Sequence, residues 1–238
     1  MFFLILACLA PENLAGSVYL IVGDILSESC PGLQSIGYRE VVLYLNKKYS
    51  YKTYLEIGVH NPKENFNKIK IKYKDGVDPK WKRNPRTGNK YEMESDQFFK
   101  EIKENKKYDL IFIDGLHTYE QTKKDIQNSL KHLSEEGTII IHDCNPKTEW
   151  HQRGIDDFHD GEEWNGTTWK AFIELRCTNS HLSMYTIDKD CGCGIIKYGK
   201  QKLYRQADLK TCLEWEYFEK NKKELLRLIR INEFFNRF

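Results

Sequence analysis

The sequence lacks a large excess of charge of either sign. Its 37 lysines and arginines nearly balance its 35 aspartates and glutamates, leaving a formal net charge of +2 at pH 7. A chain so balanced has no electrostatic need for a nucleic acid or an anionic membrane as partner. The lysine-rich stretch from Lys63 to Lys90 contains Trp81 but not the interleaved aromatics of a stacking platform. We therefore favour a solvated face or a substrate-phosphate patch there over a nucleic-acid site.

The sequence also lacks a regular cysteine pattern and a long apolar run. Its seven cysteines are odd in number and irregularly spaced, which argues against a disulfide framework and favours a reducing, cytoplasmic compartment. The run from Phe2 to Ala10 is too short to span a bilayer, and no basic residue precedes it as in a secretory signal. We expect no membrane association, with a cleaved signal as the alternative, and treat residues 1–35 as an N-terminal extension of unclear role.

What the sequence does contain is an alternation of apolar strands and amphipathic helices, typical of one α/β domain at 238 residues and 40% hydrophobic content. One apolar strand ends abruptly at Asp114-Gly115, and a second ends at His142-Asp143. The segment between them predicts an amphipathic helix that carries Asp125 and Ile126. Strand, helix and strand in this order predict a βαβ unit, which binds its ligands beyond the carboxyl ends of the strands.

The remaining patterns extend this layout to both sides. A segment from Cys144 to Gly166 has no clear periodicity, and so long an insert at a strand's carboxyl end is typical of a lid or substrate loop. We expect helices over 38–48, over 65–71, from Ser95 or Asp96 to Ile102, from Thr167 or Thr168 to Arg176, and over 207–237. We expect further strands over 53–58, in a short segment that ends at Asp78, over 182–187 and over 194–198. Residues 80–91 predict a loop.

Two earlier strand ends carry acids that suit an adenosine ligand. Glu56 and Gly58 end the first strand, and the glycine allows a close approach to the backbone. Asp78 ends the second strand, where an acid typically accepts both hydroxyls of a ribose; the alternative is a turn former before Pro79. The glycines of a dinucleotide fingerprint are missing, because His60-Asn-Pro stands in their place. A cofactor without phosphates would not need them.

Four motifs, in order and at natural spacings, make the chain resemble a known family. They are Tyr54-Leu-Glu-Ile-Gly-Val59, Gly76-Val-Asp-Pro79, Phe112-Ile-Asp-Gly-Leu-His-Thr-Tyr-Glu120 and Gly137-Thr-Ile-Ile-Ile-His-Asp-Cys-Asn-Pro146. Over about residues 38–200 the sequence resembles the class I S-adenosylmethionine-dependent methyltransferases, in the subgroup marked by I-D-G-x-H-x-Y-E and a following H-D.

The resemblance implies a Rossmann-like α/β fold, with a seven-stranded sheet, helices on both faces and an antiparallel last strand. It implies a methyltransferase domain over residues 36–205, with 144–166 as its lid, and a C-terminal helical extension over 206–238. The implied cofactor is S-adenosyl-L-methionine. Its implied contacts are Glu56 and Gly58 with the methionine and ribose, Asp78 with the ribose hydroxyls, Met93 to Asp96 with the adenine, and Asp114 with the sulfonium.

Methyl transfer is a direct displacement, which requires alignment of donor and acceptor and removal of the acceptor proton. His117 is the candidate base, and the alternative is a packing or capping residue of the helix. Asp114 and Asp143 are the other candidate catalytic residues. They could instead hold a divalent metal, Mg or Mn, with His142 as a further ligand, and such a metal would lower the pKa of an acceptor hydroxyl.

We therefore expect an O-methyltransferase that acts on a sugar, glycan precursor or other small polar metabolite. The N/D-P-P-Y/F segment of base-methylating enzymes is missing, since Asp114-Gly-Leu-His stands at that position. The alternatives are a Rossmann-type oxidoreductase using NAD and a catalytically silent module that binds the cofactor. The expected partner is a small-molecule acceptor, and a homo-oligomer stays open.

Overall fold

The computed structural model describes residues 37–159 and 161–237. The N-terminal extension expected over residues 1–35, with its apolar run, lies outside the described residues. Within the described part of the chain, no helix is both long enough and apolar enough to cross a membrane.

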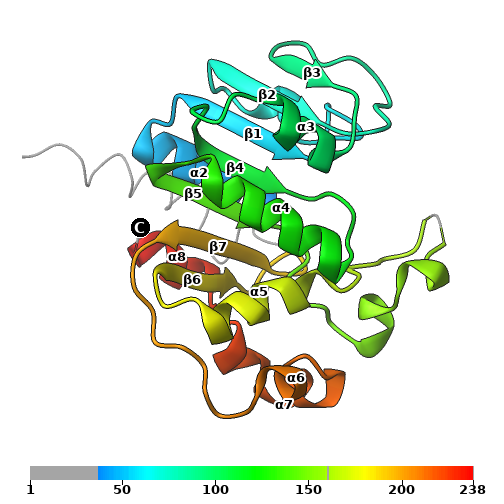
Figure 1. Cartoon of the computed structure of the whole chain (residues 1–238), viewed down its shortest axis with the longest axis vertical. Helices are drawn as coiled ribbons and strands as arrows, with labels where there is room; N and C mark the ends of the chain where they lie inside the picture. The colour runs from blue at the N-terminus through cyan, green and yellow to red at the C-terminus, as the bar shows by residue number, and fades with distance from the viewer. Residues whose placement is uncertain (1–36, 160, 238) are drawn as a thin grey trace, which may run out of the picture. The chain divides into compact units, whose positions relative to one another are not determined.

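The described residues form one sheet of eight strands in the order β3-β2-β1-β4-β5-β7-β6-β8 (Figure 1). The five strands from β3 to β5 pair in parallel, whereas β7 runs antiparallel to both β5 and β6. The bounds are β1 Thr53–Ile57, β2 Tyr73–Val77, β3 Asn89–Tyr91, β4 Tyr108–Ile113, β5 Leu133–Ile141, β6 Leu182–Ile187, β7 Cys193–Tyr198 and β8 Leu228–Ile229.

Helices cover both faces of this sheet, as the resemblance implies (Figure 1). The central strands are apolar on both sides, because Leu55 and Ile57 pack into the core under α4 and α5 while Tyr54 packs into the core under α2 and α8. The helices are α2 Tyr38–Tyr49, α3 Ser95–Glu101, α4 Tyr119–Lys131, α5 Thr168–Thr178, α6 Leu209–Cys212, α7 Trp215–Leu225 and α8 Ile231–Arg237, with short 3₁₀ turns η2 Phe66–Lys68, η3 Glu149–Gln152 and η4 Ile155–Asp157.

The C-terminal segment differs from the single helix or helix pair that its apolar stripe predicts. Leu228 and Ile229 form the short strand β8, which pairs with β6 at Thr186 and Ile187. This strand adds an eighth member to the seven predicted, since the exposed edge of β6 supplies hydrogen bonds that a helix would not use.

The helix predicted over 65–71 is also wrong, apart from the short turn η2. Phe66 and Ile69 are buried at a helix-like spacing. However, Lys74 donates from its Nζ to the carbonyls of Phe66 at 2.6 Å and Ile69 at 2.9 Å, which replaces helical hydrogen bonds. The loop predicted over 80–91 contains the short strand β3 at its end.

Candidate active site

A cleft of about 520 Å³ opens beyond the carboxyl ends of β1, β2 and β4. This is the edge of the sheet where the βαβ pattern places a ligand. Of the predicted cofactor residues, Gly58, Asp78 and Asp114 lie in its wall, as do Met93 to Ser95. The lining residues are Ile57, Gly58, His60, Val77, Asp78, Pro79, Met93, Glu94, Ser95, Asp114, Gly115, Leu116, Gln121 and Asp125.

Gly58 is required by the close approach of the backbone that follows β4. Its φ of +84° lies in the left-handed region, and a Cβ built on it would lie 1.9 Å from the carbonyl oxygen of Asp114. Asp114 in turn donates its backbone N–H to Ile57 at 2.9 Å. The glycine therefore lets the ends of β1 and β4 meet at the floor of the cleft.

Asp78 is held by backbone donors on both of its carboxylate oxygens. Oδ2 accepts from the N–H of His60 at 2.8 Å, and Oδ1 accepts from the N–H of Lys80 at 2.7 Å. Each carboxylate oxygen keeps a further lone pair. The residue thus shapes the turn before Pro79 and can still accept hydroxyl groups from the cleft.

Glu56 and Asp96 do not line the cleft. Glu56 is 2% exposed and accepts hydrogen bonds from Tyr54 Oη at 2.7 Å and Asn65 Nδ2 at 3.0 Å. Burial, with the charge of Asp114, raises the pKa of Glu56 to about 8. Asp96 instead accepts from Gln121 at 3.0 Å. The structure therefore places Glu56 within the core and Asp96 beside the cleft.

Asp125 is a cleft residue that sequence reasoning assigned only to a helix face. It is 1% exposed and accepts from Ser95 Oγ at 2.5 Å and Gln121 Nε2 at 3.1 Å. Burial raises its pKa to about 6. The sequence does offer one signal for this role: an acid at a position of the amphipathic helix that should be buried, four residues after a glutamine.

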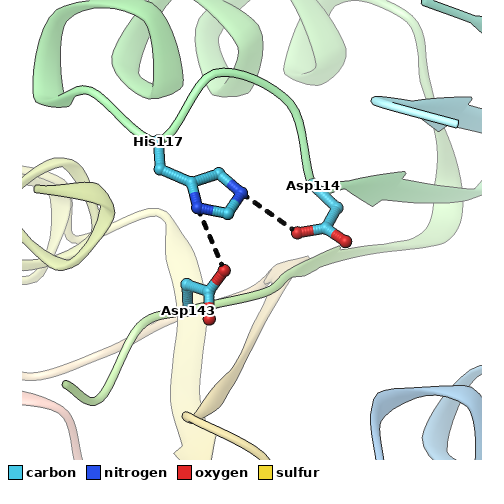
Figure 2. Close-up of side chains that lie close together, drawn as sticks. All are labelled: Asp114, His117 and Asp143. Carbon is cyan, nitrogen blue, oxygen red and sulfur yellow. Dashed lines mark ion pairs between the residues drawn. The ribbon is translucent and has the colours of Figure 1, made fainter. Parts of the chain in front are cut away.

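The ends of β4 and β5 bring four titratable side chains into contact. We call Asp114, His117, His142 and Asp143 the strand-end cluster. His117 lies between the two carboxylates, with Nε2 3.3 Å from Asp114 Oδ1 and Nδ1 3.3 Å from Asp143 Oδ2 (Figure 2). His142 Nδ1 lies 3.2 Å from each of the same two oxygens. The structure thus joins all the predicted catalytic residues and the predicted ligand His142.

His117 reaches this position from the loop before α4, and not from within the helix as the sequence suggests. The helix begins at Tyr119, and Thr118 is its N-cap, with Oγ1 accepting from the N–H of Gln121. A capping role therefore belongs to Thr118. Asp143 has a φ of 61°, and this left-handed conformation occurs directly after the end of β5.

The charges of the strand-end cluster compensate one another. Burial lowers the pKa of His142, but Asp143 and Asp114 outweigh it and raise the pKa well above its ordinary value. Burial likewise lowers the pKa of His117, and its contacts with Asp114 and Asp143 reverse this, so the net shift is upward. Burial raises the pKa of Asp114, but the charge of His142 and both imidazole contacts bring it far below the usual range. The imidazoles of His117 and His142 therefore favour the protonated form. An acceptor or a cation that enters the site competes with these imidazoles for the two carboxylates.

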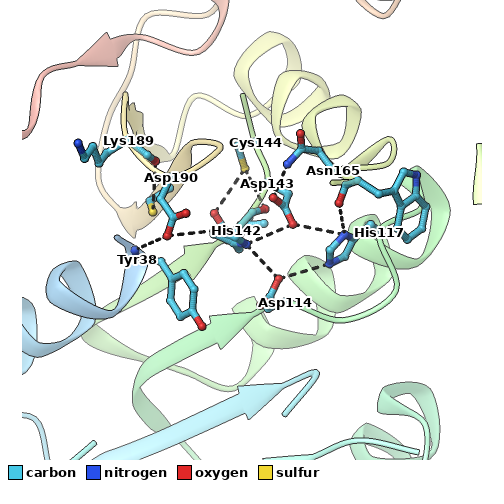
Figure 3. A network of polar contacts seen from close by, with 12 residues as sticks. Tyr38, Asp114, His117, His142, Asp143, Cys144, Asn165, Lys189 and Asp190 are labelled. Carbon is cyan, nitrogen blue, oxygen red and sulfur yellow. Dashed lines mark hydrogen bonds and ion pairs between the residues drawn. The ribbon is translucent and has the colours of Figure 1, made fainter. Parts of the chain in front are cut away.

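Several residues around the cluster carried no sequence motif. The ring of Tyr38 is stacked on that of Phe112, with centroids 5.0 Å apart. It also meets the His142 ring at 62° between the planes, with centroids 4.7 Å apart (Figure 3). Asp190 accepts from the N–H of Tyr38 at 2.9 Å and lies 3.6 Å from His142 Nε2. Asn165 donates from Nδ2 to Asp143 Oδ1.

The donor set of the cluster fits a divalent metal. Ligand atoms of Asp114, His117 and Asp143 all lie within 4.8 Å of one another. Among the described residues, Asp114 Oδ1 is buried and has no hydrogen-bond partner, although imidazole nitrogens of His117 and His142 lie 3.3 and 3.2 Å away. Two carboxylates and an imidazole suit manganese, iron or zinc, and the oxygens also suit magnesium.

Taken together, the strand order, the antiparallel β7 and the cleft at the strand ends define a Rossmann-like class I methyltransferase fold. Residues 59–144 match the family model described as a methyltransferase domain. The chain therefore has the fold that its motifs resemble, and the matched segment includes Asp78 and the strand-end cluster.

Solved structures with the same fold match the chain at low sequence identity. The SAH-bound methyltransferase PaMTH1 of Podospora anserina is 14% identical, with a TM-score of 0.50 over 82% of this chain and 100% of that chain. Cofactor-bound Rv0187 from MTB is 13% identical, with a TM-score of 0.52 over 80% of this chain and 92% of that chain. The O-methyltransferase TomG of Streptomyces achromogenes, in complex with SAM, is 10% identical, with a TM-score of 0.50 over 77% of this chain and 96% of that chain. A comparison with curated proteins finds no match.

Proposed function

We propose that the chain is an S-adenosylmethionine-dependent O-methyltransferase that acts on a hydroxyl group of a small polar metabolite, such as a sugar or a glycan precursor. One observation carries the proposal: Asp114 belongs both to the wall of the cleft and to the strand-end cluster. A cofactor in the cleft would thus present its methyl group beside groups that can accept a proton. The matched methyltransferase domain and the O-methyltransferase fold of TomG support the same reaction.

The residues have distinct roles in this proposal. Asp78 accepts the ribose hydroxyls, Gly58 forms the floor of the cleft, and Asp114 faces the sulfonium. The deprotonated form of His117 takes the proton of the acceptor hydroxyl, and the contacts with Asp114 and Asp143, each 3.3 Å away, that raise its pKa also stabilise the imidazolium so formed. Its side chain and that of Asp114 are the most exposed of the cluster, at 21% and 22%.

A divalent cation is the alternative to His117 as the base, because a ring nitrogen that binds a cation cannot also take the proton. Asp114, His117 and Asp143 would hold it, and when bound it would lower the pKa of the acceptor hydroxyl. His142 would be a further ligand: its Nδ1 lies 3.2 Å from the same oxygens of Asp114 and Asp143.

The acceptor class rests on the polar character of the cluster and on the resemblance. Trp164 gives no support to sugar stacking, since its ring is covered by His117 on one side and by Phe158 on the other, with centroids 5.2 and 4.8 Å away. The comparisons do not support an NAD-dependent oxidoreductase. A catalytically silent module that binds the cofactor would not explain the strand-end cluster.

The place of action and the partners complete the proposal. Each cysteine in the described part of the chain is a free thiol, which supports a reducing, cytoplasmic compartment. The partner we propose is the small-molecule acceptor, with neither nucleic acid nor membrane.

Thermal unfolding with S-adenosylhomocysteine, NAD or divalent metals tests the cofactor, because a ligand that binds only the folded state raises the melting temperature. We expect a shift with S-adenosylhomocysteine and none with NAD. Release of S-adenosylhomocysteine is then measured with glucose, fucose and 3,4-dihydroxybenzoate as acceptors. A shift with NAD alone would support the oxidoreductase, and binding without turnover on a wider acceptor panel would support the silent module.

A further inference from the structure

The predicted lid, residues 144–166, folds around the buried guanidinium of Arg153, whose side chain is 5% exposed. It donates to the carbonyl oxygens of Trp150 at 2.8 Å, Asp157 at 2.9 Å and Glu163 at 3.1 Å. It also pairs with Glu162 at 2.7 Å. A charged donor shared among several carbonyls holds residues 150–157 and 161–163 together as one body, although the sequence of the segment has no periodicity.

Trp164 connects this body to the strand-end cluster. Its indole Nε1 donates to the carbonyl of Arg153 at 2.8 Å. Its ring is stacked on the His117 imidazole with an angle of 21° between the planes, and Phe158 covers the other side. Its carbonyl oxygen lies 3.4 Å from His117 Nδ1. The orientation of the imidazole therefore depends on the packing of the lid.

The three residues after Trp164 contact Asp143 and the backbone of His117, and Figure 3 shows Asn165 beside Asp143. Asn165, 2% exposed, donates to Asp143 Oδ1, which leaves Oδ2 facing His117 Nδ1 at 3.3 Å. Thr167 donates its N–H to the His117 carbonyl at 2.8 Å. Gly166 has a φ of +57°, and a Cβ there would lie 2.0 Å from the same carbonyl oxygen. This segment thus fixes both partners of the His117–Asp143 contact.

We propose that Trp164 and Asn165 are positioning residues that set the His117 imidazole and the Asp143 carboxylate against each other for removal of the acceptor proton. The inference rests on the proposed function, because His117 and Asp143 act on the acceptor there. Within the described residues, no residue from 144 to 167 lines the cleft, so we expect cofactor affinity to be independent of this pair.

The test compares Trp164→Leu, Trp164→Phe and Asn165→Leu by kcat, by the KM for S-adenosylmethionine and by calorimetric affinity for S-adenosylhomocysteine. A displacement of about 1 Å can cost about 10²-fold in rate, so we expect kcat to fall by about 10- to 100-fold in both leucine variants. Cofactor KM and affinity stay unchanged. Trp164→Phe keeps a planar ring over His117 and restores most of kcat.

Trp150→Phe is the matched control, because Trp150 lies in the same lid and is 58% exposed, and phenylalanine keeps an aromatic ring for Arg153, which lies 4.3 Å from the Trp150 ring centroid. Its kcat should equal that of the wild type. A readout without turnover is the His117 Cε1–H resonance in the S-adenosylhomocysteine complex, which should lose the ring-current shift of Trp164 in Trp164→Leu and keep part of it in Trp164→Phe.

A merely structural role predicts a different result, in which melting temperature, cofactor affinity and kcat fall together and Trp164→Phe restores none of them. If the wild type is active and both leucine variants keep its kcat, the inference is overturned and the proposed function stands. If the wild type consumes no S-adenosylmethionine with any acceptor, the proposed function fails and the inference fails with it. Should Trp164→Leu not fold, Asn165→Leu decides by the same measurements.

Discussion

Replacing Glu56 with glutamine should remove a large part of the pH dependence of folding. Glu56 is buried, and its carboxyl accepts from Tyr54 and Asn65. Burial is the main cause that raises its pKa to about 8, and the charge of Asp114 adds to it, against the hydrogen bonds. A group whose pKa is higher in the folded state contributes stability that is complete below its unfolded pKa and is lost as the pH rises through the folded value.

The magnitude follows from the interval between the two pKa values. The ordinary value is 4.5, and pH 7 lies about 2.5 pH units above it and below the folded value of about 8. Each pH unit in this window costs about 1.4 kcal/mol, so the wild type should lose about 3 kcal/mol of unfolding free energy from this one group between pH 4.5 and pH 7. Glutamine cannot ionise, and its carbonyl oxygen can accept the hydrogen bonds of Tyr54 and Asn65.

The assay is urea unfolding of both proteins at pH 5, 6, 7, 8 and 9, followed by tryptophan fluorescence. The difference in unfolding free energy should move in favour of Glu56→Gln by about 1.4 kcal/mol per pH unit up to about pH 8 and then level off. Glu104→Gln, at an exposed position, should give a difference that stays flat. A flat difference for Glu56→Gln as well would refute the reasoning, since Glu56 would then ionise equally in both states.

Three further predictions concern the site. Asp78→Ala should weaken S-adenosylhomocysteine binding by about 1.5–3 kcal/mol, the range for hydrogen bonds to a charged group, and calorimetry on a folded variant that shows unchanged affinity would remove Asp78 from the ribose site. His117→Ala should lower turnover by about 10²- to 10⁴-fold with cofactor affinity intact; full turnover would make His117 a structural residue. If the strand-end cluster holds a metal, chelation should abolish turnover and manganese or magnesium restore it, with a weaker metal response in Asp143→Asn, whereas activity after exhaustive chelation would exclude the metal.

The main layout of the sheet could be predicted because its signals are local. Apolar runs that stop at Asp114-Gly115 and at His142-Asp143 mark strand ends, and parallel strands joined by a helix bring those ends to one edge. The convergence of Asp114 and Asp143 follows from that geometry. His117 was also correctly associated with this edge, although the exact start of α4 at Tyr119 was not predicted.

The wrong predictions concern segments whose local pattern competes with a tertiary partner. Leu228 and Ile229 fit a helical stripe, yet the free edge of β6 holds them as a strand. The spacing of Phe66 and Ile69 also fits a helix, but the buried ammonium group of Lys74 binds their carbonyls. Local propensity differs by fractions of a kcal/mol per residue, so one such partner decides the outcome.

By itself the sequence determined the fold class, the strand ends and the residues that gather there, because hydrophobic periodicity and chain breakers act over a few neighbouring residues. Only the tertiary structure decided which of these residues reach the cleft: Asp78 does, while Glu56 is turned into the core. The tertiary structure alone also brought Trp164 and Asn165 onto His117 and Asp143, across 47 and 22 positions of the chain. Such contacts depend on side-chain packing between distant segments, and no local pattern encodes them.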